Sequence, residues 1–178
     1  VNAQKEVLAF KCWRFNNAEL ESPDSEMQLR QILASEMPLS FLYARVTCNL
    51  FTPRATLVPA RLFHTDNLQK YFQLLLHPGD HQYACDILSE LDCSLAYVQE
   101  PALGRLCDYY FPEAFVQHQV SPLLSVWARQ TRQDDHDVLV HFRSRFIQVV
   151  VFDRDKLQFY NTFMIQSASD ALYFIMLA

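Results

Sequence analysis

The sequence predicts a mixed α/β protein, because segments with a helical spacing of apolar residues alternate with short segments rich in β-branched and aromatic residues. Leu68, Tyr71, Phe72, Leu75 and Leu76 follow the i, i+3, i+4, i+7, i+8 spacing of one helical face. The last quarter instead alternates apolar strands with polar turns, which is typical of an antiparallel meander. With 178 residues, of which 51% are hydrophobic, the chain is long enough for one domain or two small ones.

Local signals predict four elements before residue 64. Loose alternation favours a strand over residues 5–15, and the Ser-Pro-Asp run at 22–24 supplies an N-cap, a first-turn proline and a first-turn acid. We therefore expect a helix over residues 22–36. Residues 41–51 are β-branched and aromatic, which predicts a strand. Residues 56–63 contain a proline, which cannot donate to a sheet ladder, so we expect an extended edge segment there.

The middle of the chain predicts helices and a strand pair. The apolar face described above predicts a helix over residues 66–76, ended by a His-Pro-Gly run. Residues 83–91 and 94–99 predict two strands around a turn. Helical spacing returns over residues 101–111, and a Ser-Pro pair predicts the start of another helix over residues 121–128.

The C-terminal part predicts three strands and a helix. The strands are expected over residues 138–142, 146–152 and 157–163. Ser167 and Asp170 form an S-x-x-D capping box before an apolar run to Leu177. Because this run is apolar on every side, the helix needs burial between two layers. The sequence does not obviously contain a layer for one of its sides.

Composition excludes several classes of function. The two glycines, Gly79 and Gly104, cannot form a GxGxxG, GxxxxGK[ST] or GxSxG motif. The net charge is −5 with scattered basic residues, which argues against nucleic acid as a partner. The five cysteines are irregularly spaced without a CxxC pair, which favours reduced thiols and a cytoplasmic location. No apolar stretch is long enough to predict membrane insertion.

Three stretches carry a resemblance to a known family. They are Thr56-Leu57-Val58-Pro59 with Leu62-Phe63, Phe111-Pro112 followed by His118 and Ser121, and Leu157 to Phe163 leading into Asp170-Ala171-Leu172-Tyr173. Together they resemble the Bacteroidetes domain-of-unknown-function family 3822, over most of the chain. The resemblance implies an actin-like ATPase (ribonuclease-H-like) fold of two related halves, distantly similar to PilM-type pilus-assembly proteins. Each half of that fold opens with a three-stranded meander and continues as helix, strand, helix, strand, helix.

This plan divides the chain at residue 120. Residues 1–120 are expected to form the first half without its first hairpin, and residues 121–178 to begin the second half with a helix, the meander and a further helix. The final strands and helices of the second half are then expected to be missing from the sequence.

The fold family places phosphates at the first hairpin turn of each half, which here corresponds to residues 141–146. This turn contains neither the glycine nor the acidic residue that the family uses for phosphate and metal. Arg143, Ser144 and Arg145 form a candidate anion-contact turn, although a solvated turn is the favoured interpretation. We expect no cofactor and no metal, with ATP and Mg²⁺ as the alternative.

Other polar residues have structural interpretations that we favour. Asp134, Asp135, His136 and Asp137 predict an exposed interdomain loop rather than a metal cluster, because metal ligands converge from fixed elements. His77 and His81 are separated by a helix-breaking Pro-Gly pair, which argues against zinc. His118 is expected to be a packed or capping histidine rather than a general base, since no nucleophile is recognisable beside it. Asp153 and Asp155 are expected at a hairpin tip rather than across a nuclease cleft.

Three functions follow, in decreasing order of support. The first is a non-catalytic intracellular scaffold that acts by protein–protein contact on an actin-like fold. The alternative is a nucleotide-binding actin-like ATPase whose phosphate loop lies outside this sequence. A ribonuclease-H-class enzyme is the third. The observations weigh against an enzyme, and self-association through an exposed sheet edge is a further expectation.

Overall fold

The computed structural model describes residues 6–13, 23–74, 81–130, 136–143 and 145–178. It divides into two compact units, Val1–Tyr43 and Ala44–Ala178. The boundary predicted at residue 120 lies inside the second unit and stays a prediction. Among the described residues, no helix is long and apolar enough to cross a membrane.

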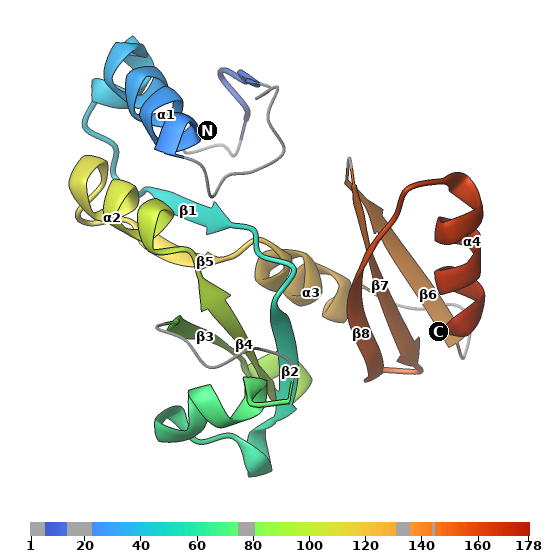
Figure 1. Cartoon of the computed structure of the whole chain (residues 1–178). Coiled ribbons are helices and arrows are strands. Elements are labelled where there is room, and N and C mark those ends of the chain that lie inside the picture. Colours follow the sequence, from blue (N-terminus) through green and yellow to red (C-terminus); the bar gives the residue numbers. More distant parts are fainter. Residues whose placement is uncertain (1–5, 14–22, 75–80, 131–135, 144) are drawn as a thin grey trace. The chain divides into compact units, whose positions relative to one another are not determined.

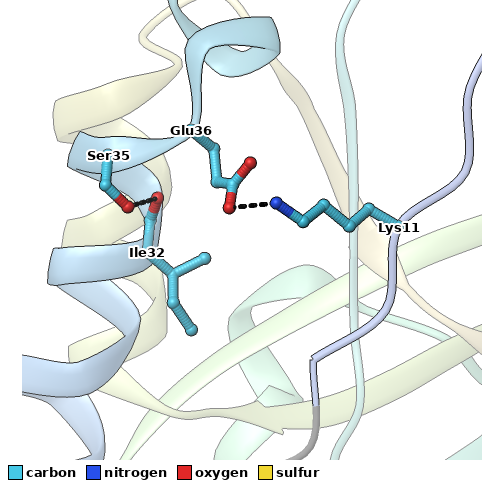
Figure 2. Close-up of polar contacts among 4 residues, drawn as sticks. All are labelled: Lys11, Ile32, Ser35 and Glu36. Atoms are coloured by element: carbon cyan, nitrogen blue, oxygen red, sulfur yellow. Dashed lines mark hydrogen bonds and ion pairs between the residues drawn. The ribbon is translucent and has the colours of Figure 1, made fainter.

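The first unit contains helix α1 (Pro23–Ser35), as predicted, and the 3₁₀ turn η1 (Met37–Ser40). The strand predicted over residues 5–15 is wrong where the structure describes it, because residues 6–13 are irregular and exposed. Alternation forms a strand only when a neighbouring strand completes its hydrogen bonds. The described contacts of residues 6–13 include side-chain contacts of Lys11. Lys11 Nζ bonds Glu36 Oε1 at 2.5 Å (Figure 2) and lies over the Trp13 ring at 5.1 Å.

Within its described residues, the second unit contains three small sheets (Figure 1). Strands β1 (Thr47–Leu50) and β5 (Phe115–His118) form a parallel pair. Strands β2 (Ala55–Pro59), β4 (Cys93–Gln99) and β3 (Gln82–Leu88) form an antiparallel sheet in the order β2-β4-β3. The meander consists of β6 (His136–Phe142), β7 (Phe146–Asp153) and β8 (Lys156–Met164).

Helices connect these sheets. They are the 3₁₀ segments η2 (Ala60–Leu62), η3 (Thr65–Phe72) and η4 (Ser89–Leu91), and the α-helices α2 (Pro101–Tyr110), α3 (Val120–Ala128) and α4 (Ala168–Leu177). Along the chain, α1 and β1 are followed by the three strands of the β2-β4-β3 sheet, and then by α2, β5 and α3.

Most predicted strands are confirmed, with shifted boundaries. The segment predicted over residues 41–51 forms a strand only at β1, and the edge segment is β2, which pairs on one side with β4. Strand β5 was not predicted. It has four residues and ends at the fully buried His118, and it forms because it pairs with β1 in register, Thr47 opposite Phe115. A short strand stabilised by a partner 68 residues away leaves little local signal.

The helix predicted over residues 66–76 is the 3₁₀ segment η3 where the structure describes it. Its apolar spacing still works as predicted, because Phe72 is buried with Leu68 and Tyr71 packed around it. The Tyr71 hydroxyl donates to the Leu62 carbonyl at 3.0 Å and accepts from the His64 amide at 2.9 Å. Leu75 and Leu76 lie outside the described residues.

Strand β7 lies between two layers and is the centre of the core. Ile147 and Val149 pack with Ala171 of α4 on one face. Val150 and Phe152 pack on the other face with residues of α3 and of the β2-β4-β3 sheet, including Leu124. Figure 1 shows α4 and α3 on opposite sides of the meander. All four β7 side chains are fully buried, as a near-continuous apolar strand requires.

Helix α4 begins with the predicted capping box. The Asp170 amide donates to the Ser167 hydroxyl at 3.2 Å, and the Ser167 amide donates to the Asp170 carboxylate at 3.0 Å. The Gln166 amide also donates to this carboxylate, at 2.8 Å, and it lowers the pKa of Asp170 most, with a further lowering by the bonds from Ser167. The helix therefore has a well-defined start that fixes which of its apolar residues face the meander.

Candidate functional site

Ligands of open α/β sheets bind at the carboxyl ends of parallel strands. In this chain β1 and β5 end side by side at Leu50 and His118. Polar groups from β3, β4, β5, α3 and the loop after β1 converge there, and we call them the His118 network. Its members are Thr52 after β1, Asp86 on β3, Tyr97 on β4, His118 on β5 and Ser121 on α3.

Both nitrogens of the His118 ring are occupied by the backbone. The Val120 amide donates to Nδ1 at 3.2 Å, so Nε2 carries the proton and donates to the Thr52 carbonyl at 2.9 Å. The side chain is fully buried, and burial lowers its pKa. The charge of Arg143 lowers that pKa further, whereas Thr52 and Asp86 raise it. His118 is therefore a neutral histidine that joins the end of β1 to the start of α3.

Asp86 accepts three hydrogen bonds. The donors are the His118 amide at 2.7 Å, the Ser121 hydroxyl at 2.5 Å and the Tyr97 hydroxyl at 3.3 Å. Burial and the Asp86 charge raise the pKa of Tyr97, which keeps its hydroxyl protonated as a donor. One carboxylate thus connects β3, β4, β5 and α3.

A Ser, a His and an Asp therefore lie together without the relationships of a catalytic triad. In a triad the serine donates to a histidine nitrogen and the aspartate orients the ring. Here the Ser121 hydroxyl donates to Asp86, and Asp86 contacts the His118 backbone rather than its ring. No buried side-chain polar atom among the described residues lacks a partner. The His118 network consequently holds elements together, as expected for a packed histidine.

The candidate anion turn separates its two arginines. The Arg143 guanidinium lies 4.2 Å from the centre of the Phe51 ring and hydrogen-bonds the Gln119 side chain. Its amide donates to the Phe146 carbonyl at 2.8 Å, so that amide is not free for a phosphate. The Arg145 side chain is exposed, and Ser144 lies outside the described residues. The anion contact stays a prediction, now with Arg143 anchored at the end of β1 rather than solvated.

The other candidate residues do not converge. His136 Nδ1 lies 3.4 Å from Asp153 Oδ1, in an exposed pair between β6 and β7. Asp134, Asp135 and His77 lie outside the described residues. Within the described part of the chain, no three histidine, cysteine or acidic side chains form a metal-binding group.

A cleft of about 750 Å³ lies between β2, the η4 turn and β8. Its charged side chains are three acids and two bases: Glu90, Asp92, Asp155, Arg61 and Lys156. Glu90 is bound to Arg129. With Arg129 counted, three acids are balanced by three bases, so the cleft has no excess of positive charge to attract a triphosphate.

Sequence reasoning missed the residues that converge from a distance. Asp86 lies 32 residues before His118, and its hydrogen bond with the His118 amide joins β3 to β5. No local spacing predicts this contact, because the two residues lie on different strands.

Comparisons with known proteins agree with this architecture. No curated protein matches the chain. A crystal structure of a Bacteroides thetaiotaomicron protein, described as having an actin-like ATPase fold and unknown function, is similar with a TM-score of 0.80 at 19% identity. The similarity covers 85% of this chain and 60% of that one, so the chain spans less than two thirds of its structural neighbour. The fold is therefore that of an actin-like ATPase, as the resemblance implies. The model of the family described as protein of unknown function (DUF3822) matches residues 1–178, and the chain belongs to that family.

Proposed function

We propose that the chain is a non-catalytic, cytoplasmic interaction module that binds a protein partner on an actin-like ATPase fold. The residues of the His118 network, which resemble catalytic groups, hydrogen-bond one another. The surface that lacks a packing partner among the described residues is the apolar outer face of α4.

The outer face of α4 carries this proposal. Leu172, Tyr173, Met176 and Leu177 are 62%, 62%, 78% and 63% exposed, and their spacing places them on one side of the helix. On the opposite side, the Phe174 ring stacks on another aromatic ring 4.3 Å away. Contiguous exposed apolar patches commonly mark protein-binding sites.

The chemistry of this face specifies the kind of partner. None of its four side chains carries a charge, so it offers nothing to a phosphate backbone. Side chains at i and i+4 form ridges into which a second helix packs. The proposed occupant is therefore an amphipathic helix of a partner protein, with its apolar side on α4.

Site-specific photo-cross-linking in the native cell tests this assignment. A photoreactive phenylalanine analogue in place of Tyr173 should cross-link one protein reproducibly. The same analogue at Tyr109, which is 72% exposed on α2, is the matched control and should not capture that protein. The substitution Met176→Glu should abolish the Tyr173 product. Identical products from both positions would contradict the proposal.

Self-association through a sheet edge is a separate expectation. Within the described residues β6 pairs on one side with β7, and Val138 and Phe142 on β6 are exposed. An open edge of this kind can accept a strand from a second copy. Light scattering should then report a dimer, and the substitution Val138→Lys should dissociate it. A monomer at all concentrations would exclude self-association through this edge.

The actin-like fold itself supports a second function, nucleotide binding. Under that alternative, the phosphate loop lies outside this sequence, because the turn after β6 lacks both glycine and an acid. Binding of Mg²⁺ and ATP by the natural gene product separates the two functions.

A further inference from the structure

The cleft beside β2 and β8 lies between two strands that each pair on one side only. Among the described residues, β2 pairs with β4 and β8 pairs with β7. Thr56, Leu57 and Pro59 of β2 line the cleft, together with the first five residues of β8. Its volume of about 750 Å³ is in the range of ligand-binding sites, about 300–1,000 Å³. Two edge strands therefore border one cleft.

The edge of β2 has main-chain groups that its sheet does not use. Two main-chain hydrogen bonds flank the β2–β4 ladder, one from the Val98 amide to the Arg54 carbonyl at 3.0 Å and one from the Ala60 amide to the residue before β4 at 2.9 Å. Bonded and non-bonded positions alternate along an antiparallel strand, so Leu57 is at a non-bonded position. Its N–H and C=O therefore point away from β4. Pro59, which has no N–H, is at the next such position, as expected on an edge strand.

The edge of β8 contains a β-bulge. The register between β7 and β8 shifts between Val151 and Phe152, which leaves Gln158 of β8 without an opposite residue. The side chain of Gln158 is exposed and lines the cleft. A bulge leaves its extra residue unpaired and changes the direction of its side chain. Gln158 therefore adds an amide donor and acceptor to the β8 wall.

The charged side chains of the cleft differ in whether they already have partners. Glu90 is bound to Arg129. Three others make no hydrogen bond or ion pair among the described residues: Arg61, Lys156 and Asp92. Two bases and one acid are thus left without a partner, which favours a ligand that carries carboxylates.

We propose that this cleft binds an extended, acidic peptide segment of a partner protein, which adds to β2 as a strand. Leu57 exchanges two main-chain hydrogen bonds with one residue of the peptide. The acidic side chains of the peptide lie beside Arg61 and Lys156, which provide the complementary charge. The outer face of α4 carries no charge and suits an apolar helix, so the two surfaces take different ligands and this proposal does not depend on the partner of α4.

Selection from a random octapeptide library displayed on phage, with the complete chain as bait, tests the proposal. The recovered peptides should be enriched in Asp and Glu. One of them, synthesised with capped ends, gives a Kd by fluorescence anisotropy. Recovery of only neutral or basic peptides, or of none, would overturn the proposal.

N-methylation of that peptide tests its strand pairing. Only every second amide of a paired strand points at its neighbour. Methylating the amides of one parity should therefore raise the Kd at least about tenfold, because a methyl group replaces the donors that face β2. Methylating the other parity should leave the Kd unchanged. Equal effects of the two parities would contradict binding as a strand.

Matched variants locate the peptide. Lys156→Glu should raise the Kd about tenfold, because it places a like charge beside the acidic peptide. Lys70→Glu is the control, since it makes the same change at an exposed lysine of η3 that does not line the cleft, and it should leave the Kd unchanged. The Tm of each variant shows that it is folded. Equal effects of the two variants, or loss of binding in Met176→Glu on α4, would overturn the assignment to the cleft.

Discussion

The His118 network and the outer face of α4 use their residues in opposite ways. In the network, polar groups from β3, β4, β5 and α3 are buried or half-buried and satisfy one another. On α4, four large apolar side chains are left in solvent. The residues that look reactive therefore stabilise the fold, and the residues that look structural are available for binding.

This contrast separates burial from function. Buried polar groups cost free energy unless they are paired, so a fully paired network is explained by stability alone. An exposed apolar stripe contributes nothing to folding when it faces water. The stripe is the feature that folding does not explain, and the proposed function rests on it.

Removing Asp86 should give the largest loss of stability. Asp86→Ala leaves the His118 amide and the Ser121 hydroxyl buried without an acceptor, which should cost about 3 kcal/mol in the free energy of unfolding. Asp86→Asn keeps the shape and one oxygen, so it should cost less. Urea unfolding measures both, and a loss below about 0.5 kcal/mol for Asp86→Ala would remove the network's structural role.

Two substitutions on α4 compare its faces directly. Phe174→Ala removes a ring stacked on Phe163 and should cost about 2–3 kcal/mol. Met176→Ala, two residues later on the exposed face, should change stability by less than about 0.5 kcal/mol. Thermal unfolding under identical conditions is the measurement. Equal costs would show that the outer face is already packed in the free protein.

The buried His118 should make stability depend on pH. Its pKa is lowered in the folded chain from an unfolded value of about 6.5, so the unfolded chain binds the extra proton first as the pH falls. Stability is then constant above about pH 7.5 and falls below about pH 6.5, by up to about 1.4 kcal/mol per pH unit, until the folded pKa is reached. Urea unfolding of His118→Gln should show a flatter profile in that window. An unchanged slope would assign the dependence to another group.

Substitutions of Arg143 and Arg145 should have the smallest effects on the free energy of unfolding. Arg143→Ala loses the contact with the Phe51 ring and should cost about 1 kcal/mol. Arg145→Ala removes an exposed side chain and should be nearly neutral. Adding inorganic phosphate sharpens the comparison. If phosphate stabilises the wild type more than either variant, the turn is an anion site as well as a structural contact.

Local features of the sequence predicted the parts of the fold that local interactions build. The capping box at Ser167 and Asp170 is an example, since its bonds span three residues. Strand β5 and Asp86 were missed because their partners come from distant segments. The strand predicted at residues 5–15 was wrong because local alternation is not enough to form a strand. Residues 6–13 have no pairing strand among the described residues. Whether Arg143 and Arg145 bind an anion depends on the conformation of their turn, which residue spacing and composition do not predict.

The central claim is that this fold of an actin-like ATPase acts by protein contact rather than through nucleotide phosphates. A thermal-shift titration of the natural gene product with Mg²⁺ and ATP or ADP tests it most directly. A ligand at about 100 times its Kd adds roughly 2.7 kcal/mol, which corresponds to a rise in Tm of about 5–10 °C. The account predicts no shift at millimolar nucleotide. A shift of that size would contradict it and establish the protein as a nucleotide binder.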